Sequence, residues 1–457
     1  MKLSFREKLF ALRMKLRYNE DFQKEYEEAK NNEKLSREQM SQLNFELCKK
    51  TVQYAYEHSP FYKQHFDKNG FKPESLRSPS DWGKVPILTK QDIKDHFDEI
   101  IVPECYPQFG SISTTGGSTG KPTKVIKDTR NHINMMVARA LDKYGVSISA
   151  NRAVVGRNVT AKSKLTRLIN DIYLFPAKKI TLDAESVSAE DIQDFVKKIN
   201  RVHPQIITGY VGTILNIARY IVKNHLNVHR IDVAWVTSAP ISEAEKQIIR
   251  KAFHGDVMDQ YGSVEISCLG FESPEHIGLY VPDDYRKIEI VDDENKPLGN
   301  DTYGNIVVTD FMNRTFPLIR YRNGDRSKII DKGGKLPFTL LAPIKGRVSD
   351  FIITPKSQTI VSGEYLTTIF DDYADYILSF QVHQHTDFST EVKYVSNPQQ
   401  NGKAIDEIVS IVKERLSKFM KNEIVLSFTA VDTIPDDRGK TRYIINDITS
   451  NYNQNQS

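Results

Sequence analysis

The chain begins with apolar residues at helical spacing. Apolar side chains recur at i, i+4, i+7 and i+11, namely at Phe5, Leu9, Leu12 and Leu16. Lysine and arginine residues lie between them, so the pattern predicts an amphipathic helix over residues 3–17 with a basic outer face. Two interpretations of the apolar stripe remain open: it packs against the rest of the protein, or it lies on an anionic membrane surface.

Capping residues mark two further helices. Ser36 and Gln39 form a capping-box pattern, which predicts the start of a long helix that continues toward Tyr54. Thr89 and Asp92 show the same pattern and predict a second helix start.

From about residue 150 the apolar pattern changes to short β-branched runs. These candidate strands occupy residues 153–155, 206–208, 233–236 and 306–308. Two of the intervening helices begin at capping boxes, Ser188 with Asp191 and Ser242 with Glu245. Strands that alternate with helices are typical of a parallel sheet, so we predict a parallel α/β core.

After residue 350 the pattern is that of a small α+β unit. It predicts a helix near 363–371, strands near 377–383 and 391–395, a helix over 403–419 and a strand over 424–429. We therefore expect an α/β protein with two parts. A large N-terminal domain would span residues 1–349, and a small, mobile C-terminal domain would span residues 350–457.

Composition supports a globular protein and limits its partners. Of the 457 residues, 39% are hydrophobic and 27% are charged, which is sufficient for a sizeable core. The net charge is only +4, from 63 lysine and arginine residues and 59 acidic residues. A dedicated nucleic-acid binder needs a denser positive field, so no nucleic-acid partner is expected.

Cysteine usage and hydropathy indicate a cytoplasmic protein. Cys48, Cys105 and Cys268 are odd in number, far apart and without zinc-site spacing, so no disulfide framework is expected. Apolar runs such as 233–236 are far shorter than the roughly 20 residues of a membrane-spanning helix. The charged residues within the N-terminal segment also argue against a signal peptide.

The segment 114–124 has the composition of a phosphate-binding loop. It reads Thr-Thr-Gly-Gly-Ser-Thr-Gly-Lys-Pro-Thr-Lys. Glycines let backbone N–H groups approach an anion, hydroxyls donate to its oxygens, and lysines offset its charge. It is not a Walker A loop, because Thr115 occupies the first glycine position and Pro122 follows the lysine. A flexible surface loop is the alternative that composition alone leaves open.

Two more motifs place carboxylates near candidate strands. Residues 260–265, Gln-Tyr-Gly-Ser-Val-Glu, follow a candidate strand at 256–258, at the strand end where ligands bind in open α/β sheets. Residues 322–325, Arg-Asn-Gly-Asp, offer a carboxylate for ribose hydroxyls. Taken alone, Asn-Gly favours a hairpin turn.

Two late motifs complete the series. Gly-Arg-Val-Ser-Asp occupies residues 346–350, where the chain pattern changes, and Arg-Gly-Lys-Thr-Arg occupies residues 438–442. In order and spacing, the five motifs resemble those of the adenylate-forming superfamily, which contains acyl-CoA synthetases and peptide-synthetase adenylation domains. Within it, the chain is similar to the phenylacetate-CoA ligase family and its CapK-type members, which are associated with capsular polysaccharide synthesis. The resemblance covers roughly residues 50–445.

The resemblance implies a two-step ligase reaction. ATP with Mg²⁺ would activate a carboxylic acid as an acyl-adenylate and release pyrophosphate, and an acceptor would then take the acyl group. The acceptor would be the thiol of CoA or of a carrier-protein pantetheine. Two alternatives stay open: an adenylate-dependent amide or ester ligase that acts on an amine or sugar, and a non-catalytic nucleotide-binding scaffold.

The resemblance also implies the residues that hold the phosphates and the adenosine. The phosphate-loop residues are Thr114, Thr115, Gly117, Ser118, Thr119, Gly120 and Lys124. The residues around the adenosine are Ser238, Ala239, Pro240, Gln260, Tyr261, Gly262 and Ser263. Tyr261 would lie against the purine.

Further roles implied by the resemblance concern charge and motion. Glu265 would hold Mg²⁺, and Asp325 would accept from the ribose hydroxyls with Arg347 nearby. Lys440 would be the catalytic cation and Asp350 the hinge of the C-terminal domain. The acid pocket is expected around Tyr210 and Gly212.

The remaining candidate metal ligands are weaker. Some relatives carry a cysteine and histidine cluster after the Tyr-Gly-x-x-Glu motif, but here Cys268 and His276 lack a second cysteine, so buried packing is expected for Cys268. His383 and His385 alternate along a candidate strand and share a face. We interpret them as a partly buried or exposed histidine pair.

Overall fold

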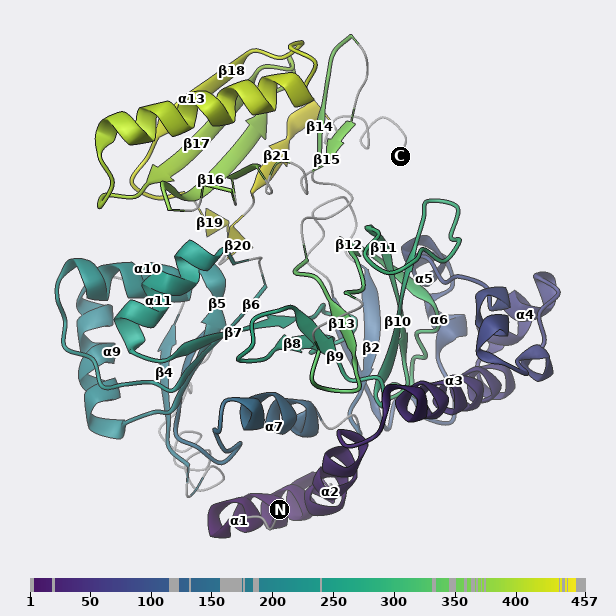
Figure 1. Ribbon diagram of the computed structural model, residues 1–457. Coiled ribbons are helices and arrows are strands. Elements are labelled where there is room, and N and C mark those ends of the chain that lie inside the picture. The colour runs from purple at the N-terminus through teal and green to yellow at the C-terminus, as the bar shows by residue number, and fades with distance from the viewer. Residues whose placement is uncertain are drawn as a thin grey trace. The chain divides into compact units, whose positions relative to one another are not determined.

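The computed structural model places the described residues in two compact units (Figure 1). The first contains Met1–Ser149 and Gln260–Ile344, and the second contains Ala150–Asp259 and Lys345–Ser457. The structure describes residues 4–448 except 19–20, 115–122, 131–132, 157–174, 176, 184–188, 239–240, 331–333, 345–350, 357–359, 363–365, 367–368, 371, 374, 435, 438–439 and 442. Residues 349 and 350, between which the domain boundary is predicted, are not among the described residues.

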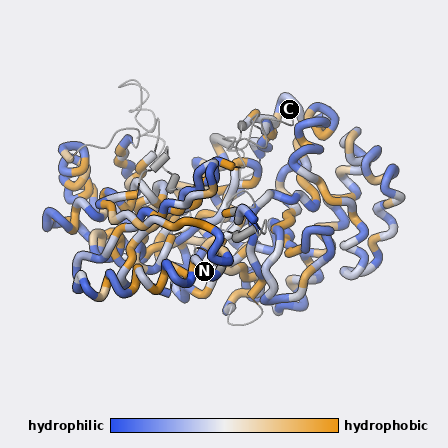
Figure 2. The backbone as a smooth tube through the Cα atoms, turned by 90° about the horizontal axis from the view of Figure 1, so that it is seen from above, coloured by the Kyte–Doolittle hydropathy of each residue, from blue (hydrophilic) through white to orange (hydrophobic). Residues whose placement is uncertain are grey.

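Helices dominate the beginning of the first unit. They are α1 (Phe5–Tyr18), α2 (Phe22–Asn32), α3 (Arg37–His58), α4 (Pro60–Lys68), the 3₁₀ turns η1 (Pro73–Ser75) and η2 (Pro79–Lys84), α5 (Lys90–Asp95), α6 (Phe97–Ile100) and α7 (Asn134–Lys143). The predicted capping boxes at Ser36 and Thr89 are both formed, and they start α3 and α5. Hydrophobic and hydrophilic stretches are interspersed along the backbone (Figure 2).

The strands of the first unit are antiparallel. They form a hairpin of β1 (Gly110–Thr114) and β2 (Lys124–Asp128), a three-stranded sheet of β10 (Arg286–Val291), β11 (Gly304–Asp310) and β12 (Tyr321–Ser327), and the pairs of β8 (Gly270–Glu272), β9 (Leu279–Val281) and β13 (Thr339–Leu341). The run 306–308 was expected in the parallel core, and that prediction is wrong. It lies in β11, whose residues are all buried, so its continuous apolar run reflects burial and not strand direction.

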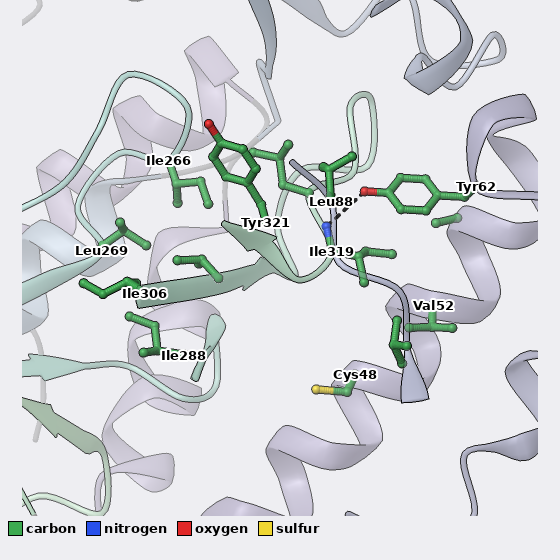
Figure 3. Close-up of a cluster of buried hydrophobic side chains, with 14 of the residues drawn as sticks. Cys48, Val52, Tyr62, Leu88, Ile266, Leu269, Ile288, Ile306, Ile319 and Tyr321 are labelled. Carbon is green, nitrogen blue, oxygen red and sulfur yellow. Dashed lines mark hydrogen bonds between the residues drawn. The ribbon is translucent and has the colours of Figure 1, made fainter. Parts of the chain in front are cut away.

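Tyr62 connects helix α4 to the core of the first unit. Its hydroxyl donates to the Pro317 carbonyl at 2.9 Å and accepts from the Ile319 N–H at 3.0 Å (Figure 3). Burial raises the pKa of Tyr62 above its ordinary value. The surrounding apolar side chains come from helices and strands far apart in sequence, and Figure 3 labels Cys48, Val52, Leu88, Ile266, Ile288 and Ile306 among them.

The first part of the second unit is the predicted parallel α/β core. Strands β4 (Lys179–Asp183), β3 (Arg152–Gly156), β5 (Ile206–Tyr210) and β6 (Val233–Thr237) are neighbours in that order, and β7 (Asp256–Tyr261) follows β6. The pairs of β3 with β4 and β5, and of β5 with β6, are parallel. Helices α9 (Ala189–Val202), α10 (Val211–Lys223) and α11 (Glu243–Phe253) lie beside these strands (Figure 1). They bury their apolar faces in the same core. The capping box of Ser242 is formed, whereas Ser188 lies outside the described residues.

The second part of this unit is the predicted α+β domain. Helix α13 (Gly402–Phe419) covers a sheet in the order β18 (Leu426–Ala430), β17 (Thr390–Ser396), β16 (Ile377–Gln384) and β21 (Ile444–Asn446) (Figure 1). Two short pairs accompany it: β14 (Phe351–Ile353) with β15 (Ile360–Ser362), and β19 (Asp436–Asp437) with β20 (Lys440–Thr441). The predicted fold class, an α/β protein with a separate α+β C-terminal domain, is confirmed.

Helix α1 packs through a different face from the one its sequence suggested. Phe10, Ala11 and Met14 contact the small core around Phe22, while Phe5, Leu12 and Leu16 are exposed. Leu9, the remaining residue of the predicted stripe, is half-buried, so the stripe as a whole is not the main packing face. Among the described residues, no helix combines the length and the apolar composition needed to cross a bilayer.

We expect Tyr62→Phe to lower the free energy of unfolding by roughly 1–3 kcal/mol, because the Pro317 carbonyl and the Ile319 N–H lose a buried partner. Thermal unfolding followed by circular dichroism measures the change. Tyr56→Phe is the matched control, since the Tyr56 hydroxyl contacts the exposed Asp67, and its effect should stay within about 0.5 kcal/mol. If the two substitutions lowered the free energy of unfolding equally, the stabilising role given to the buried Tyr62 hydroxyl would be contradicted.

Candidate functional site

The turn after β7 has room for glycine only. Gln260 and Tyr261 end β7 and pair with Phe271 and Gly270 of β8. A Cβ atom at Gly262 would lie 2.7 Å from the Cys268 nitrogen and 2.7 Å from Gln260 Nε2, which is closer than real Cβ contacts. The chain therefore turns sharply directly after Tyr261.

Ser263 closes this turn and so determines where Glu265 lies. The Ser263 N–H donates to the Ile266 carbonyl at 3.0 Å, and the Ile266 N–H donates to Ser263 Oγ at 3.1 Å. Glu265 is buried within this closed segment. The adjacent Cys268 is buried as well, as expected for a packing residue.

Asp325 lies beside Tyr261. The Tyr261 hydroxyl donates to Asp325 Oδ2 at 2.8 Å, and Asn323 Nδ2 donates to the Tyr261 hydroxyl at 2.6 Å. Asn323 Oδ1 also accepts from the Asp325 N–H at 3.0 Å. A buried carboxylate, a phenol and an amide thus form one connected cluster.

The Asn-Gly pair at 323–324 does not form a hairpin turn, so that alternative is wrong. It lies within β12, where the register against β11 shifts from Val307 opposite Arg322 to Asn305 opposite Arg326. The extra residues form a bulge, and Gly324 takes a φ of +88° that favours glycine. The bulge brings Asp325 to Tyr261 instead of leaving it in the regular strand ladder.

Glu265 is held by a second tyrosine, Tyr321, which begins β12, the strand that also contains Asp325. The Tyr321 hydroxyl donates to Glu265 Oε1 at 3.1 Å, and the Tyr321 ring lies in the buried core (Figure 3). Tyr261 of the turn therefore binds Asp325 of the strand, and Tyr321 of the strand binds Glu265 of the turn. Sequence reasoning missed Tyr321. A repeated spacing in the sequence could have indicated Tyr321: a tyrosine stands four residues before an acidic residue both in 261–265 and in 321–325.

The candidate phosphate loop closes the hairpin of β1 and β2. Thr114 and Lys124 are directly opposite each other in this hairpin, and Lys124 is exposed. Residues Thr115, Gly117, Ser118, Thr119 and Gly120, together with the Thr114 side chain, lie outside the described residues. The pairing shows that the loop starts and ends at one point of the first unit.

Side chains of β2 join this hairpin to the rest of the first unit. Lys127 Nζ donates to Ser267 Oγ at 3.4 Å, two residues after Glu265. Asp128 Oδ2 accepts from the Thr315 N–H and hydroxyl, at 3.0 and 2.8 Å. The hairpin is thereby joined to Ser267, just after Glu265, and to Thr315 in the segment before β12.

The predicted pocket residues lie at one edge of the parallel sheet in the second unit. Tyr210 ends β5 and is opposite Thr237 at the end of β6, so Ser238 directly follows this edge. Gly212 is buried in the first turn of α10. Ligands bind at such carboxyl edges of parallel strands. Ala239 and Pro240 lie outside the described residues.

The backbone of Lys440 is in β20, opposite Asp437 of β19. The Lys440 side chain, Arg347 and Asp350 lie outside the described residues. Strand β20 packs near α10, and the Tyr443 hydroxyl donates to Glu245 Oε2 at 3.4 Å. Burial raises the pKa of Glu245, while hydrogen bonds from Ser242 act in the opposite direction. The segment after Lys440 is thus attached to the start of α11.

Comparison with protein families and curated proteins gives a consistent result. Residues 352–447 match the family described as CapK C-terminal domain. The chain is 25% identical to Protein CapK of Staphylococcus aureus over 98% of this chain and 96% of that protein. It is also 25% identical to a phenylacetate-coenzyme A ligase of Thermus thermophilus, over 70% of this chain and 73% of that protein.

Comparison with solved structures shows the same fold. A 2-hydroxyisobutyryl-CoA ligase, solved in the postadenylation state with an acyl-AMP, matches with a TM-score of 0.71 at 17% identity, over 90% of each chain. An amide bond synthetase from Marinactinospora thermotolerans matches with a TM-score of 0.52 at 15% identity, over 73% of this chain and 68% of that chain.

We expect Tyr321 and Glu265 to be energetically coupled, because their hydrogen bond is buried. In a double-mutant cycle of Tyr321→Phe and Glu265→Leu, the coupling energy should be about 1 kcal/mol, measured from thermal unfolding. Additive effects would contradict the contact. Tyr321→Phe with Glu391→Leu is the control pair, because Glu391 lies in the C-terminal domain, and it should be additive.

Proposed function

Because the chain belongs to the adenylate-forming superfamily, in the branch of the phenylacetate-CoA ligases and CapK, we propose that it is an AMP-forming ligase of carboxylic acids. In the first step the acid carboxylate attacks the α-phosphate of ATP, the acyl-adenylate forms and pyrophosphate leaves. In the second step the thiol of CoA displaces AMP, and an acyl thioester forms.

The observation that carries this proposal is the pair of reciprocal tyrosine–carboxylate contacts. Asp325, oriented by Tyr261 and Asn323, has the acceptor oxygens that ribose hydroxyls need. Glu265, oriented by Tyr321, offers the hard carboxylate oxygen that Mg²⁺ prefers. Both groups are held before a ligand binds, which reduces the reorganisation required in the reaction.

The phosphate loop and Lys440 complete the proposed machinery. Thr114, Thr115, Ser118, Thr119 and Lys124 would donate to the phosphate oxygens, with Gly117 and Gly120 allowing close approach of the backbone. Lys440 would offset the charge that develops at the α-phosphate. Mg²⁺, when bound with ATP, supplies further charge neutralisation on the phosphates. Asp350 would be the hinge about which the C-terminal domain reorients between the two steps. Arg347 would lie near the ribose.

Two parts of the proposal concern specificity. The acid would bind next to Tyr210 and Gly212, at the edge of the parallel sheet. The proposed capsule-associated pathway rests on the similarity to Protein CapK and on the match to the CapK C-terminal domain family. Amide formation is a second candidate, because the chain is also 27% identical to an indoleacetate–lysine synthetase of Pseudomonas savastanoi over 57% of this chain.

We expect acid-dependent ATP–pyrophosphate exchange when the protein is given a panel of arylacetic, benzoic and 2-hydroxy acids. Lys440→Ala should reduce the exchange by about 100-fold, the effect of losing one preorganised donor. Glu265→Gln should reduce it comparably, because the metal loses a charged ligand. Lys413→Ala, an exposed lysine on α13, is the matched control and should leave the rate unchanged. Undiminished exchange in Lys440→Ala would remove this lysine from the mechanism.

The acceptor is identified by a second measurement. AMP release that requires CoA, with a thioester product, supports the acid–thiol ligase. Release that requires an amine or a sugar and no thiol supports the amide or ester ligase. Nucleotide binding without any exchange across the panel would favour the scaffold.

A further inference from the structure

The C-terminal domain brings two histidines and an aspartate together. His383 lies in β16, and His385 follows two residues later, directly after the strand, on the same side. Strand β21 is parallel to β16, with Ile445 opposite His383 and Asn446 opposite Gln384. Asp447 follows Asn446, so the same register places it opposite His385 and close to both imidazole rings.

The three side chains have the spacing of metal ligands. Their nearest ligand atoms all lie within 4.8 Å of one another. His383 Nε2 lies 2.8 Å and His385 Nδ1 lies 3.7 Å from Asp447 Oδ2. In a tetrahedral zinc site with ligand bonds of about 2.0–2.1 Å, neighbouring ligand atoms lie roughly 3.3 Å apart. Small rotations of the side chains therefore suffice to reach that geometry.

We propose that His383, His385 and Asp447 bind a divalent transition-metal ion of the Zn²⁺ class. Two imidazoles and one carboxylate suit zinc, whereas calcium and magnesium prefer oxygen ligands. The side chains are 24%, 41% and 40% exposed, so an ion has access from solvent and a water can take the remaining position. No step of the proposed ligase reaction uses these residues.

Metal binding at this position would stabilise the end of the chain that carries the candidate lysine. Asp447 directly follows β21, and β21 begins four residues after Lys440. An ion shared by β16 and Asp447 therefore holds β21 in its register. We expect metal binding to raise the thermal stability of the C-terminal domain, because an ion that binds only the folded state stabilises it by mass action.

The test is zinc binding by the untagged, chelator-treated full-length protein, measured by isothermal titration calorimetry with ZnCl₂ and by thermal unfolding. We expect one ion per chain and an increase in the unfolding temperature. His385→Gln and Asp447→Asn should each weaken binding by at least about tenfold. Both side chains are partly exposed, so circular dichroism is expected to show folded variants.

His229→Ala is the matched control. His229 stacks on His203 with the ring centroids 3.9 Å apart, but among the described residues this pair belongs to no group of three candidate metal ligands. The His229→Ala variant should bind zinc as the unmodified protein does. Absence of binding, or binding that His385→Gln and Asp447→Asn leave unchanged, would overturn the proposal. Neither result would bear on pyrophosphate exchange, so this test is independent of the proposed function.

A separate observation concerns the outer face of α1. Phe5, Leu12 and Leu16 are 77%, 57% and 77% exposed, and at 100° per residue they lie on one side of the helix. Phe10, Ala11 and Met14 lie on the opposite side and pack against α2 and α7. The helix is therefore already held by one face while it presents a second apolar face outward.

Basic residues border the exposed stripe on both sides. By the same helical angle, Lys8 and Lys15 lie along one edge and Arg6 and Arg13 along the other. Glu7, the acid in this helix, points away from the stripe, because its carboxylate accepts from Ser4 and Ser147. The outer face thus combines an apolar centre with flanking positive charge.

We infer that this face docks on an anionic membrane surface. Apolar side chains would enter the boundary between headgroups and acyl chains, while the long basic side chains extend to the lipid phosphates. The charge pattern selects an anionic lipid over a neutral one. A single helix of this length gives weak, reversible binding.

Co-sedimentation of the full-length protein with vesicles tests this inference. We expect binding to vesicles of phosphatidylcholine with phosphatidylglycerol, weaker binding in high salt, and little binding to phosphatidylcholine alone. The triple substitution Phe5→Ser, Leu12→Ser and Leu16→Ser should remove the binding. Val425→Ser, which also removes an exposed apolar side chain, should not.

Vesicle binding that survives the triple substitution would overturn the inference. So would concentration-dependent dimers, seen by analytical ultracentrifugation and lost in the triple variant, without any vesicle binding. That result would assign the face to a second copy of the chain.

Discussion

The reciprocal contact between the turn 261–265 and the strand segment 321–325 is the interaction on which the candidate site depends. Each segment supplies one tyrosine hydroxyl and one carboxylate, and each hydroxyl donates to the carboxylate of the other segment. Both carboxylates are buried, so neither would keep its position without a donor. The two groups proposed to bind ribose and Mg²⁺ are therefore positioned by the same pair of hydrogen bonds.

This arrangement rests on a rigid core. Tyr321 belongs to the apolar cluster that also contains Tyr62, and Tyr62 binds the backbone just before β12 at Pro317 and Ile319. The turn is fixed from the other side by Gly262 and Ser263. Close packing on both sides leaves few alternative positions for the carboxylates, which is the preorganisation that electrostatic catalysis requires.

The C-terminal domain combines a stable sheet with a short strand pair that carries Lys440. Helix α13 and strands β16 to β18 form a continuous buried core. Strand β20, by contrast, pairs with β19 through two residues only, and Tyr443 attaches the next segment to Glu245. A firm sheet with a lightly held segment would suit the role proposed for Lys440, which requires this lysine to act in one step and withdraw in another.

Local rules were sufficient for much of this protein. Capping boxes at Ser36, Thr89 and Ser242 start helices where the sequence predicted them, because a cap is made by residues only three positions apart. The parallel α/β core and the α+β domain also followed from periodicity and spacing, and the motif order pointed to the superfamily.

Contacts between distant residues required the tertiary structure. Whether Asn323 and Gly324 make a turn or a bulge depends on the register of β12 against β11. The local turn preference of Asn-Gly does not determine that register. Tyr321 contacts Glu265 across 56 residues of sequence, and the pairing of β16 with β21 brings Asp447 to His383 across 64 residues. The sequence showed that α1 has an apolar stripe, but only packing decided that Phe10 and Met14 face inward, because a helix with apolar residues on two sides can bury either one.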